Sequence, residues 1–153
     1  MNKKIYVAAS FSYLDQAKTN KRKSEIKVVV NKIKKLSKVE YNWFLPQNIE
    51  VPDAWKLSLE EWSREVYKKD LDALEEADIV LFISYGKENN SGSAWETGYA
   101  FAKNKPIIMI KMNDEVESLM LFGSAHAIMM YSEIEIYDWE SLPRYMTKLS
   151  RLS

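Results

Sequence analysis

Two nearly unbroken apolar runs, at residues 78–84 and 106–111, constrain the fold of this chain more than any other feature of its sequence. Strands that are covered on both faces have this pattern, and such strands are typical of parallel sheets. Shorter runs that are rich in β-branched and aromatic residues predict further strands. These runs lie at residues 5–9, 39–45, 127–130 and 134–136.

Predicted helices alternate with these strands. Apolar residues spaced three and four apart predict an amphipathic helix over residues 26–36. A second helix is predicted over residues 59–76, with Trp62, Val66, Leu71 and Leu74 as its candidate core residues. Shorter helices are predicted at residues 94–103, 115–122 and 139–152. The alternation predicts an α/β fold, with one domain over residues 1–153. Its expected architecture is a three-layer sandwich around a five-stranded, mostly parallel sheet of the flavodoxin-like or Rossmann-like type.

Composition excludes several classes of function. The 153 residues include 22 basic and 22 acidic ones, so the net charge is zero, which argues against a partner that is a nucleic acid polymer. The absence of cysteine excludes disulfides, zinc–thiolate sites, iron–sulfur clusters and a thiol nucleophile. A single histidine, His126, excludes a multi-histidine metal site, so no metal is expected. With no signal-like segment and no apolar run of membrane-spanning length, we expect a cytoplasmic protein without a membrane partner.

The polar loops that follow the predicted strands are the first place to search for a site, because ligands of open parallel sheets bind at the carboxyl ends of strands. The segment N-N-S-G-S-A-W-E-T-G-Y at residues 89–99 follows a buried strand and opens a helix. Small residues there, such as Gly92 and Ser93, let a ligand approach the amides at the helix start. Glu96 is expected in the first turn of this helix. At this position Glu96 either takes part in a reaction or only stabilises the start of the helix. It would stabilise the helix by complementing its dipole or by closing a capping box with Ser93.

Four motifs, in the same order along most of the chain, resemble the nucleoside 2-deoxyribosyltransferase family. They are I-Y-V-A-A at residues 5–9, Y-K-K-D-L at 67–71 followed by A-D-I-V at 77–80, the glutamate–x-G-Y-A frame at 90–100, and S-L-M at 118–120 with Gly123. The related nucleoside 5′-monophosphate N-glycosidases belong to the same group. The resemblance implies an enzyme that uses a small nucleoside or nucleotide and a free nucleobase, and that needs no metal or organic cofactor.

The resemblance also implies roles for individual residues. Glu96 matches the nucleophile that traps the sugar covalently, Tyr6 the hydroxyl that holds this carboxylate in line, and Asp70 the acid that protonates the leaving base. From the residues alone, the preferred interpretation is that Tyr6 is a core tyrosine and Asp70 a helix-surface acid. The expected substrate contacts are Asn90, Gly92, Ser93, Phe11, Gln47, Ser118 and Met120. Ser118 and Met120 lie in the segment that one subunit lends to its neighbour's active site, so the resemblance implies a homo-oligomer with shared sites.

Asn90 departs from the family pattern, because transferases usually carry an aspartate there that binds the sugar hydroxyls. The monophosphate glycosidases carry a small hydroxyl residue at that position and a serine at the position of Ser118. The segment 18–38, with nine basic residues and one acidic, is either a solvated helix face or a rim that attracts phosphate. Three functions are therefore carried forward: a nucleoside 2-deoxyribosyltransferase as the preferred one, a 2-deoxynucleoside 5′-monophosphate N-glycosidase, and a non-catalytic nucleotide-binding module. In a transferase, Asn90→Asp is expected to be tolerated.

Overall fold

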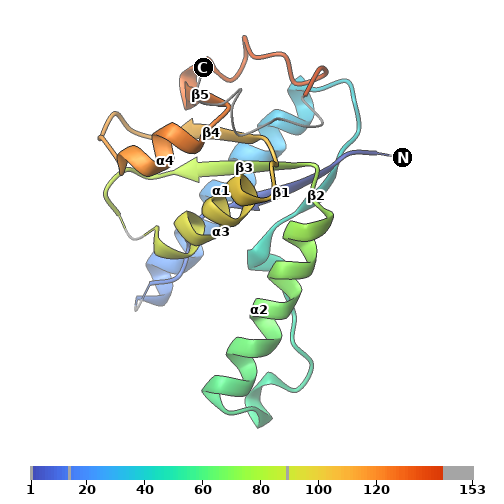
Figure 1. Cartoon of the computed structure of the whole chain (residues 1–153). Coiled ribbons are helices and arrows are strands. Elements are labelled where there is room, and N and C mark those ends of the chain that lie inside the picture. The colour runs from blue at the N-terminus through green and yellow to red at the C-terminus, as the bar shows by residue number, and fades with distance from the viewer. Residues whose placement is uncertain (1, 14, 89, 143–153) are drawn as a thin grey trace.

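A five-stranded sheet, in which all strands run parallel, forms the centre of the computed structural model, which describes residues 2–13, 15–88 and 90–142. The strand order is β2-β1-β3-β4-β5 (Figure 1). The strands are β1 (Lys4–Ala8), β2 (Asn42–Phe44), β3 (Ile79–Ser84), β4 (Ile107–Lys111) and β5 (Ala127–Met130). The helices are α1 (Gln16–Leu36), α2 (Leu59–Glu76), α3 (Ser91–Ala102) and α4 (Leu119–Ser124), with 3₁₀ turns η1 (Pro46–Asn48), η2 (Ala54–Lys56) and η3 (Tyr131–Glu133).

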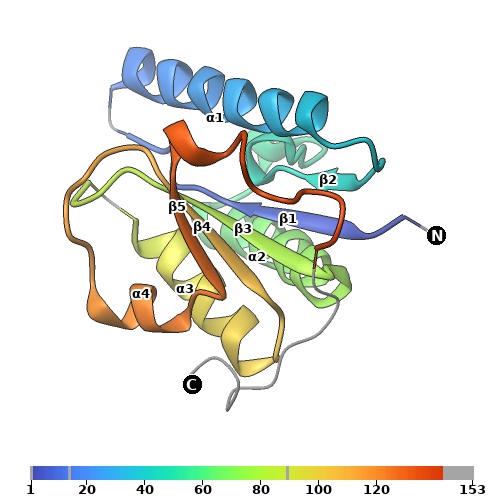
Figure 2. The ribbon, with the colours of Figure 1, turned by 90° about the horizontal axis from the view of Figure 1, so that it is seen from above.

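Alternate residues of each strand enter two separate apolar layers, so the predicted three-layer α/β sandwich is confirmed. In β3, Ile79, Leu81 and Ile83 face α1, whereas Val80 and Phe82 face α2, α3 and α4. Figure 2 shows α1 and the segment that follows β5 on one side of the sheet, and α3 with α4 on the other. Because side chains alternate along a strand, a residue's parity decides which layer it enters. We call the two sides the α1 face and the α2/α3 face.

The helix boundaries follow from local hydrogen bonds at the helix ends. Asp15 accepts from the amides of Ala17 and Lys18 and so begins α1. Ser58 and Glu61 form a reciprocal capping box at the start of α2. Because these caps fix where each helix starts, they also fix which of its side chains reach the sheet. None of the described helices is long and apolar enough to cross a membrane.

Several predicted elements differ from the structure. Helix α1 begins at Gln16 rather than at residue 26, and α4 covers Leu119–Ser124 rather than 115–122. The second strand covers Asn42–Phe44 rather than 39–45, because Asn42 already pairs with Lys4 at the start of β1, and Pro46 has no amide to extend the ladder. Residues 134–136 form a turn rather than a strand, since the amide of Ile134 donates to the carbonyl of Tyr131. The predicted helix at 139–152 lies largely outside the described residues, and the described residues 139–142 are not helical.

Helix α2 differs most from its predicted environment. Of its four candidate core residues only Leu74 is buried, and Trp62 is 44% exposed. Figure 1 shows that the first half of α2 extends beyond the edge of the sheet. The predicted apolar face is therefore real, but half of it is not part of the core.

The candidate active site

Tyr6, Asp70 and Glu96 come from three different elements and meet on the α2/α3 face. Tyr6 lies in the middle of β1, is fully buried, and stacks on Phe44 with ring centroids 5.3 Å apart. Its even position in the strand points its side chain toward the helices that carry Asp70 and Glu96. Each of the three residues affects the pKa of the other two or is affected by it, so they form one electrostatic cluster.

The cluster is buried but its hydrogen bonding is incomplete. Tyr6 Oη, Asp70 Oδ1 and Glu96 Oε2 are buried and have no hydrogen-bond partner of normal geometry among the described residues. Native proteins rarely leave such atoms unpaired, because each costs about 1–3 kcal/mol of desolvation free energy. Three such atoms from three elements, close enough for the Tyr6 hydroxyl to influence both acids, are typical of a functional site rather than of a packed core.

Burial sets the protonation of the two acids. It raises the pKa of Glu96 to about 8, with the Tyr6 hydroxyl opposing this rise and the charge of Asp70 adding to it. Burial also raises the pKa of Asp70, again against the effect of the Tyr6 hydroxyl. The pKa of Tyr6 itself is raised far above its usual range, first by burial and then by the two carboxylates. Both carboxyls therefore bind protons more readily than exposed acids do, which suits acid–base chemistry.

A cleft of about 300 Å³ between α2 and α3 gives access to both acids. Besides Asp70 and Glu96 its lining is mostly apolar and aromatic, with Trp62, Ser63, Val66, Tyr67, Gly92 and Trp95. Tyr67 packs edge-on against Trp95, which stacks on Tyr99, so that one aromatic row forms a wall. A Cβ placed on Gly92 would lie 4.0 Å from Glu96 Oε1, so the glycine keeps one side of this carboxylate open.

The expected position of Glu96 in the first helical turn is wrong. Helix α3 begins at Ser91, three residues earlier than predicted, so Glu96 is in the second turn. Ser93 forms no capping box with it, because the Ser93 hydroxyl is buried and lies 2.9 Å from the hydroxyl of Ser10. This contact joins the loop after β1 to α3, and the substrate contact expected of Ser93 stays a prediction.

Asn90 directly precedes α3, as its N-cap residue, and its side chain makes no capping bond. Instead its Nδ2 donates to Glu117 Oε2 at 3.2 Å. Glu117 lies in the connection between β4 and α4 and is only 7% exposed. The sequence analysis missed this residue, and the only available signal was its place in a loop at the carboxyl edge of the sheet.

Phe11 and Gln47 lie together, but they do not line the cleft. The ammonium group of Lys23 lies 5.3 Å from the ring centroid of Phe11, and Gln47 Nε2 donates to the Lys23 carbonyl at 3.1 Å. Gln47 Oε1 is buried without a partner among the described residues. Their base contacts remain predictions.

Ser118 and Met120 lie at the start of α4. The Ser118 hydroxyl accepts from the Met120 amide and so caps this helix. Met120 is 82% exposed and Leu119 beside it 79% exposed. Neither Ser118 nor Met120 lines the cleft of its own chain.

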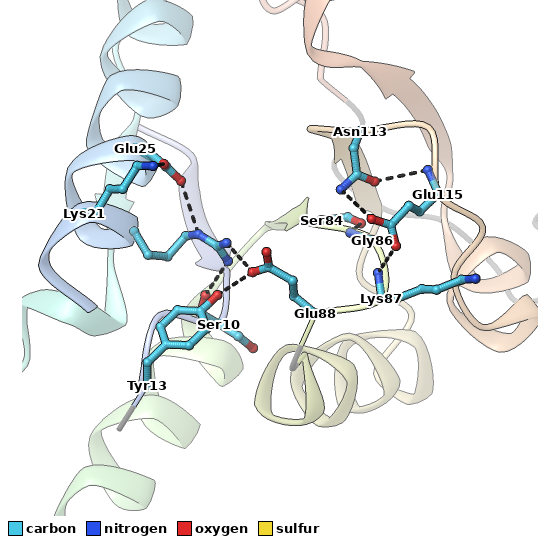
Figure 3. A network of polar contacts seen from close by, with 11 residues as sticks. Ser10, Tyr13, Lys21, Glu25, Ser84, Gly86, Lys87, Glu88, Asn113 and Glu115 are labelled. Atoms are coloured by element: carbon cyan, nitrogen blue, oxygen red, sulfur yellow. Dashed lines mark hydrogen bonds and ion pairs between the residues drawn. The ribbon is translucent and has the colours of Figure 1, made fainter. Parts of the chain in front are cut away.

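A second, larger cavity of about 690 Å³ lies on the α1 face. Arg22 lines this cavity and donates to Glu25 Oε2 and to Glu88 Oε2. Its Cζ atom lies 3.3 Å from the centroid of the Tyr85 ring. The Tyr13 hydroxyl also donates to Glu88 (Figure 3). Lys18 and Lys21, the start of the predicted basic rim, line this cavity and not the cleft with Glu96.

No three His, Asp or Glu side chains in the described part of the chain are arranged to hold a metal ion.

An α/β sandwich with two buried carboxyls in one cleft has the groups that enzymes use to break glycosidic bonds. A family model described as nucleoside 2-deoxyribosyltransferase matches residues 5–129. The chain belongs to this family, which consists of enzymes that act on N-glycosidic bonds.

Individual relatives agree with this assignment. The nucleoside deoxyribosyltransferase of Lactobacillus johnsonii is 30% identical over 88 residues, which make up 56% of this chain and 58% of that protein. The match thus spans less than two thirds of that relative. The 2-deoxyribosyltransferase of Bacillus psychrosaccharolyticus is similar in structure, with a TM-score of 0.72 and 28% identity over 94% of this chain and 98% of its own. The CMP N-glycosidase of Clostridium botulinum shares the fold, with a TM-score of 0.55 and 19% identity over 88% of this chain and 95% of its own.

Proposed function

We propose that the protein is a nucleoside 2-deoxyribosyltransferase, which moves a 2-deoxyribosyl group from one nucleobase to another. The observation that carries the proposal is the pairing of Glu96 and Asp70 in one cleft, with the Tyr6 hydroxyl between their charges. Two carboxyls with raised pKa values can divide the work of nucleophile and acid.

In the proposed reaction, the Glu96 carboxylate attacks C1′ of the sugar, and the N-glycosidic bond breaks with its electron pair going to the base. Asp70 gives its proton to the leaving base, and the Tyr6 hydroxyl stabilises the Glu96 carboxylate in its attacking position. An acceptor base then attacks C1′ from the face that the first base left and returns a proton to Asp70. Two inversions give net retention, and Glu96 is released.

The test is an incubation of the protein with a deoxynucleoside, with and without a second free base. A transferase forms the new deoxynucleoside at a rate that depends on the acceptor base. A hydrolase releases free deoxyribose, or its phosphate, at the same rate with or without the acceptor, and a binding module does neither. Formation of free sugar alone from a 5′-monophosphate would replace the proposal by the N-glycosidase reaction.

The N-glycosidase remains the second candidate because of Asn90, which lacks the negative charge of the transferases' aspartate. The basic segment 18–38, which could form a rim that attracts phosphate, gives the N-glycosidase less support than Asn90 does. Lys18 and Lys21 line the other cavity, and Arg22 is already paired with Glu25 and Glu88.

We propose further that the active enzyme is a homo-oligomer whose cleft is completed by a neighbour. Support comes from exposed apolar side chains. Trp62 lines the cleft and Leu119 and Met120 begin α4, and the others are Trp55, Leu59 and Val116. In a shared site, Ser118 and Met120 of one subunit lie near Glu96 of the next. Mixing Glu96→Ala with Met120→Asp subunits then restores activity that neither has alone, whereas a fully active monomer in sedimentation contradicts the proposal.

A further inference from the structure

The cavity on the α1 face contains a carboxylate that belongs to an exposed loop residue. The Glu88 side chain is 53% exposed, yet its Oε2 accepts from the Arg22 guanidinium and from the Tyr13 hydroxyl (Figure 3). The Tyr13 hydroxyl and Arg22 lower the pKa of Glu88, and the charge of Lys18 adds to their effect. Guanidinium and ammonium groups are also those with which proteins bind phosphate. Glu88 therefore occupies a place that suits an anion from solution.

Arg22 is anchored in this cavity more firmly than Glu88. The Arg22 side chain is only 9% exposed, donates to Glu25 Oε2 at 3.2 Å and lies with its Cζ 3.3 Å from the centroid of the Tyr85 ring. Neither contact involves Glu88, so both remain when Glu88 turns toward solvent. An ion pair with an exposed partner contributes little to stability. An anion that accepts more hydrogen bonds than one carboxylate oxygen can therefore replace Glu88.

Replacement of Glu88 leaves a positive surplus that matches one kind of ligand. The charged residues that line the cavity are Lys18, Lys21, Arg22, Glu25 and Glu88. Without Glu88, three cations face one carboxylate, so the surplus is two positive charges. A phosphate monoester carries about −1.5 to −2 charges at neutral pH and has three strong acceptor oxygens. A phosphate group thus balances this surplus, whereas one carboxylate balances only half of it.

Two further features of the cavity favour a ligand from outside the chain. Tyr85 lines the cavity, and its Oη is buried with no hydrogen-bond partner of normal geometry among the described residues. Burial raises the pKa of Tyr85 against the effect of the Arg22 charge, so the hydroxyl stays protonated and can donate. The volume of about 690 Å³ lies in the range that proteins use for small organic ligands, and it leaves room beside a phosphate group.

We propose that the α1-face cavity is a second ligand site, which binds a phosphate group, free or in a monoester, in place of the Glu88 carboxylate. Arg22 and Lys18 neutralise its charge, and the Tyr13 hydroxyl donates to one of its oxygens. The site is separate from the active site, because the residues that line the cavity include none of those that line the cleft with Glu96. It therefore binds a ligand other than the substrate, and it does not depend on the proposed function.

The experiment measures the binding of inorganic phosphate and of ribose 5-phosphate by titration calorimetry. Glu88→Gln keeps the shape of the side chain but removes the competing charge, so Kd should fall at least about tenfold. Lys18→Gln should raise Kd about three- to tenfold, whereas Lys34→Gln, near the other end of α1, should change it less than about twofold. A lower Kd for ribose 5-phosphate than for phosphate identifies a monoester as the ligand, and equal values identify the phosphate group alone.

Further titrations test whether the phosphate lies in this cavity. The double variant Glu88→Gln with Lys18→Gln should return Kd toward the wild-type value, because both changes act on one charge balance. Saturating deoxynucleoside in the Glu96→Ala background should leave Kd unchanged. No binding by either the wild type or Glu88→Gln overturns the inference, as does a Kd that Glu88→Gln does not lower. Displacement of phosphate by deoxynucleoside also overturns it, because the phosphate then lies in the cleft with Glu96.

Discussion

The cavity around Arg22 and the cleft with Glu96 lie on different faces of one sheet, and their charged groups are in opposite states. On the α1 face, Arg22 is paired with Glu25 and Glu88, and its guanidinium together with the Tyr13 hydroxyl lowers the pKa of Glu88. On the α2/α3 face, no cation among the described residues affects the pKa of Asp70 or Glu96, and burial raises both pKa values. The first arrangement is close to complete without a ligand, and the second is not.

The pairing state of the charged groups identifies the active site better than the volume of the cavity does. The α1-face cavity is more than twice as large, at about 690 Å³ against about 300 Å³. Paired charges stabilise a fold, whereas unpaired buried acids with raised pKa values reduce its stability and are characteristic of catalytic centres. The comparison predicts that equivalent substitutions in the two cavities have different consequences.

The largest expected difference is in turnover. Glu96→Ala removes the nucleophile, so we expect kcat to fall by about 10⁴-fold or more with the fold intact. Glu88→Ala, in the loop just before α3, is the matched control and changes kcat less than about threefold. A 2-fluoro sugar analogue, which slows the second step, should label Glu96 in a mass spectrum of peptides. Labelling of another residue, or near-normal rates in Glu96→Ala, contradicts the assignment.

Asp70→Asn tests the acid. Loss of the proton donor should lower kcat about 10²- to 10³-fold for bases that are poor leaving groups. The loss should shrink for a base that leaves well without protonation. Asp72→Asn, on the exposed side of the same helix, serves as the control. A loss that is independent of the leaving base would show that Asp70 positions the substrate rather than protonating it.

Tyr6→Phe tests the hydroxyl between the acids. This hydroxyl lowers the pKa of Glu96, so its removal raises that pKa further above about 8. Because only the carboxylate attacks, the rising limb of the kcat/KM–pH profile should move to higher pH. The loss at pH 7 is then about tenfold and decreases by pH 9. Tyr13→Phe on the α1 face leaves the profile in place, and an equal loss at every pH contradicts this role.

Stability should respond with opposite signs in the two cavities. The pKa of Glu96 is about 8 in the fold against an ordinary 4.5, so the folded state loses stability as pH rises from about 4.5 to about 8. Glu96→Gln removes this loss and raises Tm by several degrees at pH 8 but not at pH 4.5. Arg22→Met breaks the ion pairs and lowers stability by about 1–3 kcal/mol, or roughly 2–10 °C in Tm. If calorimetry at pH 8 shows that Glu96→Gln and Arg22→Met change Tm in the same direction, the comparison is contradicted.

The sequence predicted the sheet well because a strand that is covered on both faces has an unmistakable apolar pattern, as in residues 79–84. It predicted Tyr6, Asp70 and Glu96 through family motifs, and the structure places them together. It could not predict Glu117, since a single acid in a loop has no periodicity and its partner Asn90 is 27 residues away. It misjudged α2 for a related reason. Periodicity identifies an apolar face but does not indicate whether anything covers that face.

The uncovered half of α2 has a consequence for the energetics of binding. Its wall residues, Trp62 and Tyr67, are 44% and 52% exposed, and Leu74 is the one buried residue of the helix, so this half has little anchorage in the core. Local opening of such a segment requires far less free energy than global unfolding, so its amide protons should exchange early with solvent deuterium. Only protein molecules in which this half of α2 is folded can bind substrate. The apparent dissociation constant therefore rises in inverse proportion to the fraction of molecules in that state. A neighbour packed on this half-helix would tighten substrate binding without touching the substrate.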